Sequence, residues 1–92
     1  MTYYVYILRS EAQGSYYVGQ TDNLEKRLES HNRGHVRSTK NGGPWKLVYF
    51  EGYALRREAV VREREIKSRK KRKYIESLIQ AERSAVPSRL PG

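Results

Sequence analysis

The sequence predicts a small α+β domain with three strands and three helices, and two observations lead to this fold class. Aromatic and β-branched runs typical of strands alternate with segments of helical periodicity. The 92 residues are 37% hydrophobic, which is enough for one modest core but not for two. We therefore expect one domain over residues 1–83, followed by a flexible tail at 84–92.

The chain opens with a predicted β-hairpin. One strand covers residues 3–8 (YYVYIL) and its return strand covers 15–20 (SYYVGQ). Between them lies a short turn at 11–14, where Gly14 can adopt the positive φ that such turns need.

The register of this hairpin decides which side chains share a face. If Ser10 faces Ser15, Tyr6 lies opposite Gly19, and Tyr17 falls on the same face as Tyr6. Glycine has no side chain, so we expect open space across from the Tyr6 ring. A slip of the register by one residue would separate the two tyrosines.

A helix is predicted after the hairpin. Asp22 is a suitable N-cap, Glu25 completes a capping-box pattern, and Gly34 is a suitable residue to end the helix. Arg27 and His31 are four residues apart and flank the apolar stripe. Both side chains are therefore expected to point obliquely toward the sheet.

A polar, glycine-rich loop follows at 35–44 and carries Arg37 and Lys40. It is long for so small a domain, and long loops are more often functional than idle. A third strand is predicted at 45–51 (WKLVYFE).

Two further helices are predicted at 54–67 and 70–83, with a break near Ser68. The apolar stripe of the last helix is expected in the core; it consists of Tyr74, Ile75, Leu78 and Ile79.

The helix at 54–67 has a carboxylate on its expected core face. That face is formed by Leu55, Ala59, Val60 and Ile66, with Glu63 near its middle. An unpaired charge there is costly. Three interpretations remain open: a salt bridge to Arg27 or a neighbouring arginine, a metal ligand, or a different helix phase.

The charge distribution favours a polyanionic partner. Residues 1–34 hold four basic and four acidic residues, whereas residues 35–92 hold fifteen and six, which accounts for the net charge of +9. Clustered basic residues release counterions from nucleic acid. A solvated basic surface, or an acidic membrane or protein partner, are the alternatives. The expected nucleic-acid contacts are Arg37, Lys40, Lys67, Arg69, Lys70 and Lys71.

The segment at 67–73 (KSRKKRK) holds six basic residues among its seven. Basic charge at a helix N-terminus opposes the helix dipole, and this cost indicates a function. A nuclear localisation signal is the other interpretation of such a run.

Several chemistries are excluded by composition. There is no cysteine, which removes disulfides, thiol catalysis and zinc–cysteine sites. The N-terminus lacks the pattern of a signal peptide, and no apolar run is long enough to span a bilayer. We therefore expect a cytoplasmic protein.

The residues that remain suit hydrolysis of a phosphodiester. They are the two strand tyrosines, Arg27 and His31 on one helix, and Glu63 on another. One carboxylate can hold a hydrated Mg²⁺, an arginine can stabilise phosphate charge, and a phenol or imidazole can carry a proton. Each signal also has an ordinary interpretation, namely packing tyrosines, a surface arginine and a solvated histidine.

At residues 2 to about 80 the sequence resembles the GIY-YIG nuclease family, in particular its small stand-alone bacterial subfamily. The two half-motifs are Tyr4-Val5-Tyr6 and Tyr17-Val18-Gly19. The resemblance continues through Asn23, Leu24, Arg27, Leu28, His31-Asn32, Arg62-Glu63, Ile66-Lys67, Lys71 and Leu78-Ile79.

The resemblance implies a three-stranded antiparallel sheet flanked by helices and a metal-dependent endonuclease site, acting on DNA in repair or processing. Tyr6 and Tyr17 would be the motif tyrosines, one of which assists deprotonation of the attacking water. Arg27 would stabilise the phosphate, His31 would assist, and Glu63 would bind one Mg²⁺ or Mn²⁺. The rival hypotheses are a non-catalytic nucleic-acid-binding module and a nuclease subunit that depends on a partner.

The sequence departs from the family pattern at two positions. Tyr4 stands where the motif has its first glycine, which the subfamily tolerates. Gln20 stands where the excinuclease C branch has a lysine, and Arg37, Lys40 or Lys67 could take its place. Many members also carry a separate DNA-binding domain, so specificity here is expected from a protein partner, from substrate shape, or to be low.

Overall fold

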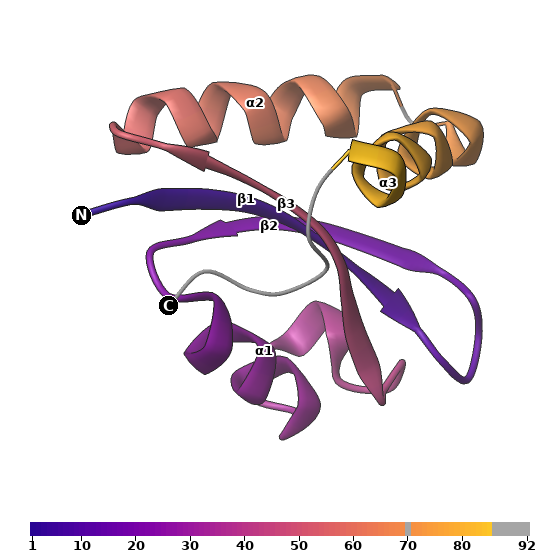
Figure 1. Cartoon of the computed structure of the whole chain (residues 1–92). Coiled ribbons are helices and arrows are strands. Elements are labelled where there is room, and N and C mark those ends of the chain that lie inside the picture. Colours follow the sequence, from indigo (N-terminus) through magenta and orange to yellow (C-terminus); the bar gives the residue numbers. More distant parts are fainter. Residues whose placement is uncertain (70, 86–92) are drawn as a thin grey trace.

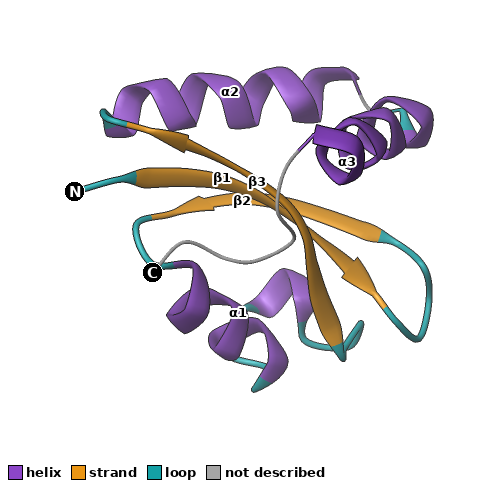
Figure 2. Cartoon of the chain, viewed as in Figure 1, coloured by secondary structure: helices purple, strands orange, loops and turns teal. Residues whose placement is uncertain are grey.

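The protein is a three-stranded antiparallel sheet with helices on both faces (Figures 1 and 2). The computed structural model describes residues 1–69 and 71–85. The strand order is β2-β1-β3, so β1 lies in the centre. The elements are β1 (Tyr3–Ser10), β2 (Tyr16–Thr21), α1 (Leu24–Asn32), the 3₁₀ turn η1 (Arg37–Thr39), β3 (Trp45–Tyr53), α2 (Arg56–Arg69) and α3 (Arg72–Ala85). The predicted fold class is confirmed.

The hairpin between β1 and β2 has the predicted register. Tyr6 lies opposite Gly19, and the backbone N–H of Ser10 donates to the carbonyl of Ser15 at 2.8 Å. Gly14 adopts φ 72° in the turn, a conformation that glycine reaches without steric cost.

The central strand β1 divides the interior into two hydrophobic clusters, because successive side chains point to opposite faces. Val5 and Ile7 join the cluster beneath α2 and α3. Tyr6 and Leu8 join the cluster on the side of α1. Figure 1 shows α2 and α3 on one face of the sheet and α1 on the other.

The start of α1 differs from the prediction by one residue. Asn23 is the N-cap, and its side-chain oxygen accepts from the backbone N–H of Lys26 at 3.0 Å. Because β2 continues through Thr21, Asp22 is left as the connection and pairs loosely with Arg56 at 3.9 Å. Asparagine and aspartate cap equally well, so the sequence alone does not separate them. Gly34 follows the helix with φ 77°, as predicted.

The core face of α2 is largely as predicted, with Ala59 and Ile66 buried. Leu55 is a correction: it precedes the helix and its side chain is 44% exposed. The break between the last two helices falls after Arg69 rather than near Ser68. In α3 the expected stripe packs into the core with Ile79 buried.

The basic segment at 67–73 is also placed differently from the prediction. Lys67 and Arg69 occupy the last turn of α2, where positive charge is favourable to the helix dipole. Only Arg72 and Lys73 stand in the first turn of α3. The expected cost therefore applies to two residues, not to the whole segment.

Two predictions fall partly outside the described residues. The expected nucleic-acid contact Lys70 lies outside them. Within the expected tail at 84–92, α3 continues to Ala85, and residues 86–92 lie outside the described part of the chain. In the part that the structure describes, no helix is long and apolar enough to cross a membrane.

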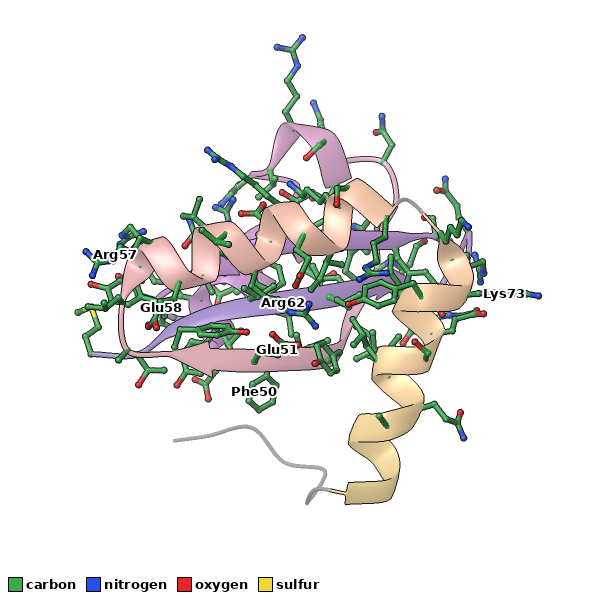
Figure 3. All side chains as sticks on the ribbon, turned by 90° about the horizontal axis from the view of Figure 1, so that it is seen from above. Phe50, Glu51, Arg57, Glu58, Arg62 and Lys73 are labelled. Atoms are coloured by element: carbon green, nitrogen blue, oxygen red, sulfur yellow. The ribbon has the colours of Figure 1, made fainter. Side chains whose placement is uncertain are left out.

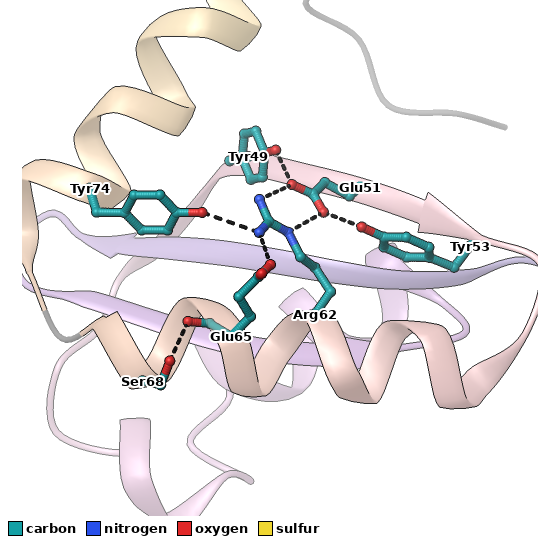
Figure 4. A network of polar contacts seen from close by, with 7 residues as sticks. All are labelled: Tyr49, Glu51, Tyr53, Arg62, Glu65, Ser68 and Tyr74. Carbon is teal, nitrogen blue, oxygen red and sulfur yellow. Dashed lines mark hydrogen bonds and ion pairs between the residues drawn. The ribbon is translucent and has the colours of Figure 1, made fainter.

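A polar network, here called the Glu51 network, ties α2 and α3 to β3 (Figure 4). The Glu51 carboxylate accepts from two tyrosine hydroxyls and from Arg62, whose Nε and Nη2 atoms lie at 2.8 and 3.0 Å. Arg62 also donates to Glu65 and to the hydroxyl of Tyr74. The network consists of Tyr49, Glu51, Tyr53, Arg62, Glu65 and Tyr74; Figure 4 also draws Ser68, which donates to the backbone carbonyl of Glu65.

Side chains outside this network extend from both ends of the helical layer. Figure 3 shows Arg57 near the start of α2 and Lys73 in the first turn of α3, pointing away from the domain, whereas Arg62 and Glu51 face each other. The network therefore joins the two helices from within, and the exposed cations play no part in it.

Candidate active site

The site is built around the ring of Tyr6, which β1 directs to the α1 face of the sheet. Tyr6 is only 2% exposed, and its ring lies across Gly19 on the neighbouring strand. A Cβ atom at Gly19 would stand 2.6 Å from the Tyr6 hydroxyl and 2.7 Å from Cζ. The expected open space at Gly19 is thus filled by the tyrosine itself.

Two side chains of α1 hold the Tyr6 hydroxyl. Arg27 Nε donates to it at 3.3 Å, and His31 Nε2 lies 2.8 Å from it. The spacing of four residues puts both side chains on the sheet-facing flank of the helix, as predicted. His31 is only 1% exposed, so its interpretation as a solvated histidine is wrong.

Burial dominates the acid–base properties of these groups. It raises the pKa of Tyr6 to about 12, against the opposite effect of the hydrogen bond from Arg27. Burial, together with the charge of Arg27, lowers the pKa of His31 to about 4. At neutral pH Tyr6 is therefore a phenol and His31 a neutral imidazole.

Tyr17 completes an aromatic wall beside these groups. Its ring centroid lies 4.9 Å from that of His31 and 6.4 Å from that of Tyr6. The ring of Trp45 contacts it edge-on at 6.5 Å. We call Tyr6, Tyr17, Arg27 and His31 the tyrosine cluster. The sequence analysis expected all four residues at one site, and the structure brings them together.

Glu63 belongs to α2, which lies on the opposite face of the sheet from α1 and packs on β1 and on the edge strand β2. Its side chain is 19% exposed, and its charge contributes to the raised pKa of Tyr6. Lys67 Nζ lies 2.7 Å from Glu63 Oε2 and 6.0 Å from the centroid of the Tyr17 ring. The partner of Glu63 is thus a lysine one turn away, not Arg27 or a neighbouring arginine.

Sequence reasoning missed the residues that shape the loop after α1. Thr39 is buried, and its hydroxyl lies 2.7 Å from His31 Nδ1. The Trp45 indole donates to the Thr39 carbonyl at 2.9 Å. Asn32 brackets the backbone of Trp45, accepting from its N–H at 2.6 Å and donating to its carbonyl at 3.1 Å. The adjacent pair His31-Asn32 was the one available signal for this arrangement.

Three of the expected nucleic-acid contacts, Arg37, Lys40 and Lys67, lie next to residues of the tyrosine cluster or to its partner Thr39, and the others that the structure describes lie toward α3. Arg37 and Lys40 are exposed on either side of Thr39, and Lys67 is half-exposed beside Tyr17. Lys71 is exposed between α2 and α3. Arg69 lies over the ring of Tyr74 at 4.6 Å.

The donor set suits one hard cation with few protein ligands. Among the described residues no group of three or more histidine, aspartate or glutamate side chains is arranged to hold a metal ion. Glu63 offers a single carboxylate. Mg²⁺ is commonly bound by one or two carboxylates together with water and substrate phosphate. Glu63 therefore fits such an ion once its ion pair with Lys67 is broken.

An open hollow of about 440 Å³ lies elsewhere, beside the Glu51 network. It is lined by Tyr53, Arg57, Glu58, Val61, Arg62 and Glu65. No residue of the tyrosine cluster lines it, so it is not the candidate active site.

Comparison with known proteins shows the family and agrees with the fold. The family model of the GIY-YIG catalytic domain matches residues 2–75. A UPF0213 protein of Clostridium perfringens is 51% identical over 65 residues, which cover 70% of this chain and 69% of the relative. A UPF0213 protein of Bacillus pumilus is 40% identical over 80 residues, covering 83% and 81% of the two chains.

A solved structure shares the fold. The solution NMR structure of a UPF0213 protein from Bacillus halodurans is 33% identical and covers 88% of this chain and 85% of its own, with a TM-score of 0.55. The fold and the site together define a small α+β domain with a tyrosine-centred polar cluster on one sheet face. The chain belongs to the GIY-YIG nuclease family.

Proposed function

We propose that this chain is a metal-dependent endonuclease that cleaves phosphodiester bonds of nucleic acid, with DNA in repair or processing as its substrate. The observation that carries the proposal is the hydrogen-bonded chain from Arg27 through Tyr6 to His31, with the Glu63 carboxylate placed so that its charge acts on Tyr6. A packing role for Tyr6 alone needs neither a buried histidine nor an inward carboxylate.

In this proposal Tyr6 carries the proton of the attacking water. Because burial raises the pKa of Tyr6 to about 12, the phenol is protonated and acts as a base only if its own proton leaves. It passes that proton to His31 Nε2 while its oxygen takes one from water. The new water oxygen–phosphorus bond forms as the bond to the leaving oxygen breaks, and the leaving oxygen takes a proton from solvent.

Arg27 has two roles in the same reaction. Its guanidinium binds the phosphate and stabilises the charge that develops there. The charge of Arg27 also helps to lower the pKa of His31. A phosphate beside Arg27 offsets that repulsion, so binding of the substrate makes His31 a better proton acceptor. Tyr17 lines the cluster next to His31.

Glu63 would hold one Mg²⁺ or Mn²⁺. When bound, the ion supplies Lewis-acid stabilisation of phosphate charge and lowers the pKa of bound water. Lys67 is then free to turn toward the phosphate. Its position beside Tyr17 supports it as the residue that takes the place of the family lysine at Gln20.

Nucleic acid would be held by basic residues beside the tyrosine cluster together with those of the basic segment at 67–73. We assign phosphate contacts to Arg37, Lys40, Lys67, Arg69, Lys70 and Lys71. Such contacts release counterions, so binding should weaken steeply with salt, with a log–log slope of about −0.9 per phosphate neutralised on duplex DNA. A protein partner can add specificity that these contacts do not supply.

A non-catalytic binding module is the second candidate, and one observation favours it. Glu63 already has a cation partner in Lys67 at 2.7 Å, so its inward position is accounted for without a metal. The same basic residues would then bind nucleic acid without cleavage.

The test is cleavage of single-stranded, duplex, flapped and branched DNA, and of matching RNA, with Mg²⁺ or Mn²⁺. Glu63→Gln removes the charge at nearly constant shape, and Glu65→Gln on the same helix is the matched control. Cleavage that is lost in Glu63→Gln but kept in Glu65→Gln supports the nuclease. Tight binding without cleavage by any form overturns it in favour of the binding module or the partner-dependent subunit.

A further inference from the structure

The hydroxyl of Thr39 is a buried polar group that the proposed reaction does not yet use. Thr39 ends the 3₁₀ turn η1 and is 1% exposed. Its Oγ1 atom lies 2.7 Å from His31 Nδ1 and 3.3 Å from the carbonyl oxygen of Val36. It therefore contacts the ring nitrogen of His31 that faces away from Tyr6.

The direction of each hydrogen bond follows from which groups can donate. A guanidinium only donates, so the Tyr6 oxygen accepts from Arg27. In the described part of the chain, the other polar contact of this oxygen is His31 Nε2. The proton of Tyr6 therefore goes to Nε2, which must carry no proton of its own.

The same reasoning continues on the other side of the ring. Neutral imidazole has one N–H group, and with Nε2 accepting, that group is on Nδ1. Nδ1–H donates to Thr39 Oγ1, and the threonine hydroxyl donates to the Val36 carbonyl. All protons in the chain then have an acceptor.

The opposite tautomer leaves a proton without a partner. With a proton on Nε2, the Tyr6 oxygen would face two donors, Arg27 and His31. The proton of Tyr6, a residue 2% exposed, would then lack an acceptor among these contacts. Burying an unsatisfied donor is costly, so the arrangement selects the Nδ1–H form.

We propose that Thr39 is a positioning residue that holds His31 as its Nδ1–H tautomer and so keeps Nε2 free to accept the proton of Tyr6. The indole of Trp45 donates to the Thr39 carbonyl at 2.9 Å, so the fold of the loop after α1 holds the acceptor that Nδ1–H needs. The tautomer follows from the contacts alone, and its consequence for cleavage rests on the proposed function.

The direct test is the ¹⁵N NMR spectrum of the histidine side chains above pH 7, where the two ring nitrogens of each tautomer differ strongly in shift. The wild type should show a protonated Nδ1 and an unprotonated Nε2 for His31. Thr39→Val should move both signals toward the other tautomer, and Thr39→Ser should restore them. His35, which is exposed, is an internal reference, and Thr2→Val repeats the substitution at an exposed position.

Two results would overturn the assignment: a protonated Nε2 in the wild type, or wild-type signals in a folded Thr39→Val. If Thr39→Val does not fold, the wild-type spectrum and Thr39→Ser decide. Cleavage adds a separate readout. Thr39→Val should lower kcat by roughly 10–100-fold, the size of effect seen when a metal-binding histidine loses the hydrogen-bond partner of its other ring nitrogen. KM should be unchanged, and Thr39→Ser should be near wild type.

The two experiments distinguish a wrong positioning role for Thr39 from a wrong proposed function. A wild type that cleaves nothing but has the expected tautomer removes the nuclease and keeps the assignment. A wild type that cleaves, with a folded Thr39→Val cleaving equally fast, removes the positioning role and keeps the nuclease.

Discussion

Gly19 is the residue on which the position of the Tyr6 ring depends. Gly19→Ala would put a methyl group 2.6 Å from the Tyr6 hydroxyl, closer than any van der Waals contact, so the ring must move. We expect cleavage to fall by about 10²-fold, because small misplacements of catalytic groups have effects of this size. The measurement is single-turnover cleavage at saturating enzyme.

Gly52→Ala on β3 is the matched control for this substitution. Its Cβ would meet Thr2 Cγ2 at 3.2 Å, which is the far end of an exposed side chain that can turn aside. Activity close to wild type in Gly52→Ala and lost in Gly19→Ala is the expected pair. Full activity in Gly19→Ala would mean that the Tyr6 hydroxyl has no part in the reaction.

The ion pair between Lys67 and Glu63 leads to a prediction in which loss of the lysine strengthens metal binding but slows cleavage. A divalent ion must displace Lys67 from the Glu63 oxygen that it contacts at 2.7 Å. Lys67→Met removes the competitor, so Mn²⁺ should bind several-fold more tightly, by calorimetry or electron paramagnetic resonance. Cleavage should nevertheless fall, since a phosphate contact beside Tyr17 is lost.

Lys71→Met, which changes an exposed lysine of the same basic segment, should leave Mn²⁺ affinity unchanged. Equal affinities in wild type and Lys67→Met would show that Glu63 is not where the ion binds.

At the scale of single residues, the sequence predicts on which face a side chain lies, because the periodicity of the backbone controls it. The shared face of Tyr6 and Tyr17 follows from strand register, and the inward position of Glu63 from helix phase. The burial of His31 and the contact with Thr39 do not follow. They depend on how a polar loop folds back, and loop conformation has no period that sequence reasoning can use.

Among the elements, β3, α2 and α3 are joined by the Glu51 network. Burial alone would raise the pKa of Glu51, but hydrogen bonds from Arg62, Tyr49 and Tyr53 hold it below its ordinary value. Arg62→Met would leave this carboxylate half-buried without its cation. We expect the free energy of unfolding to fall by about 2–4 kcal/mol, slightly less than for a fully buried pair. Urea unfolding followed by circular dichroism measures it.

Arg57→Met is the control for this prediction, because Arg57 is an exposed arginine of the same helix. Such surface changes usually stay within about 0.5 kcal/mol. If Arg62→Met were equally harmless, the network would not hold the two helices on β3.

The elements themselves were predictable in type but less so in their ends. The third strand runs two residues past the predicted end at Glu51, because Gly52 and Tyr53 still pair with Tyr4 and Tyr3. Long-range pairing of this kind has no signal in the local sequence. The helix cap was misplaced from Asn23 to Asp22 for a different reason. Here the local signal exists, but both residues carry it equally.

For the whole molecule, His31 predicts how stability depends on pH. Its pKa lies near 4 in the folded protein and near 6.5 in the unfolded chain, so the unfolded chain binds more protons between these values. Linkage then requires the contribution of His31 to the free energy of unfolding to be completely present above pH 6.5 and to decrease as the pH falls toward 4. Urea unfolding at a series of pH values measures this slope.

His31→Gln should flatten the slope in this window, although the variant is less stable overall. The remaining loss at still lower pH belongs to carboxylates such as Glu51, whose pKa is held low. A wild-type curve that is level between pH 6.5 and 4 would mean that water reaches the histidine and that its pKa is ordinary.

The fold class was predictable for the whole molecule because strands and helices each carry their own period. The assignment of α1 to one face of the sheet, and of α2 and α3 to the other, was not. That division depends on β1 lying between β2 and β3, an order that becomes visible only when residues more than forty positions apart are paired, as Tyr6 is with Phe50.

The same strand order has a consequence for synthesis on the ribosome. The central strand is made first, and its second neighbour β3 is made only after the hairpin, α1 and the long loop. Until β3 emerges, one edge of β1 lacks its partner, and the face of the hairpin that α2 and α3 will cover is exposed. The nascent hairpin is therefore the form most exposed to aggregation. The risk of aggregation falls only when α2 and α3, the last parts of the domain to be translated, pack on the sheet.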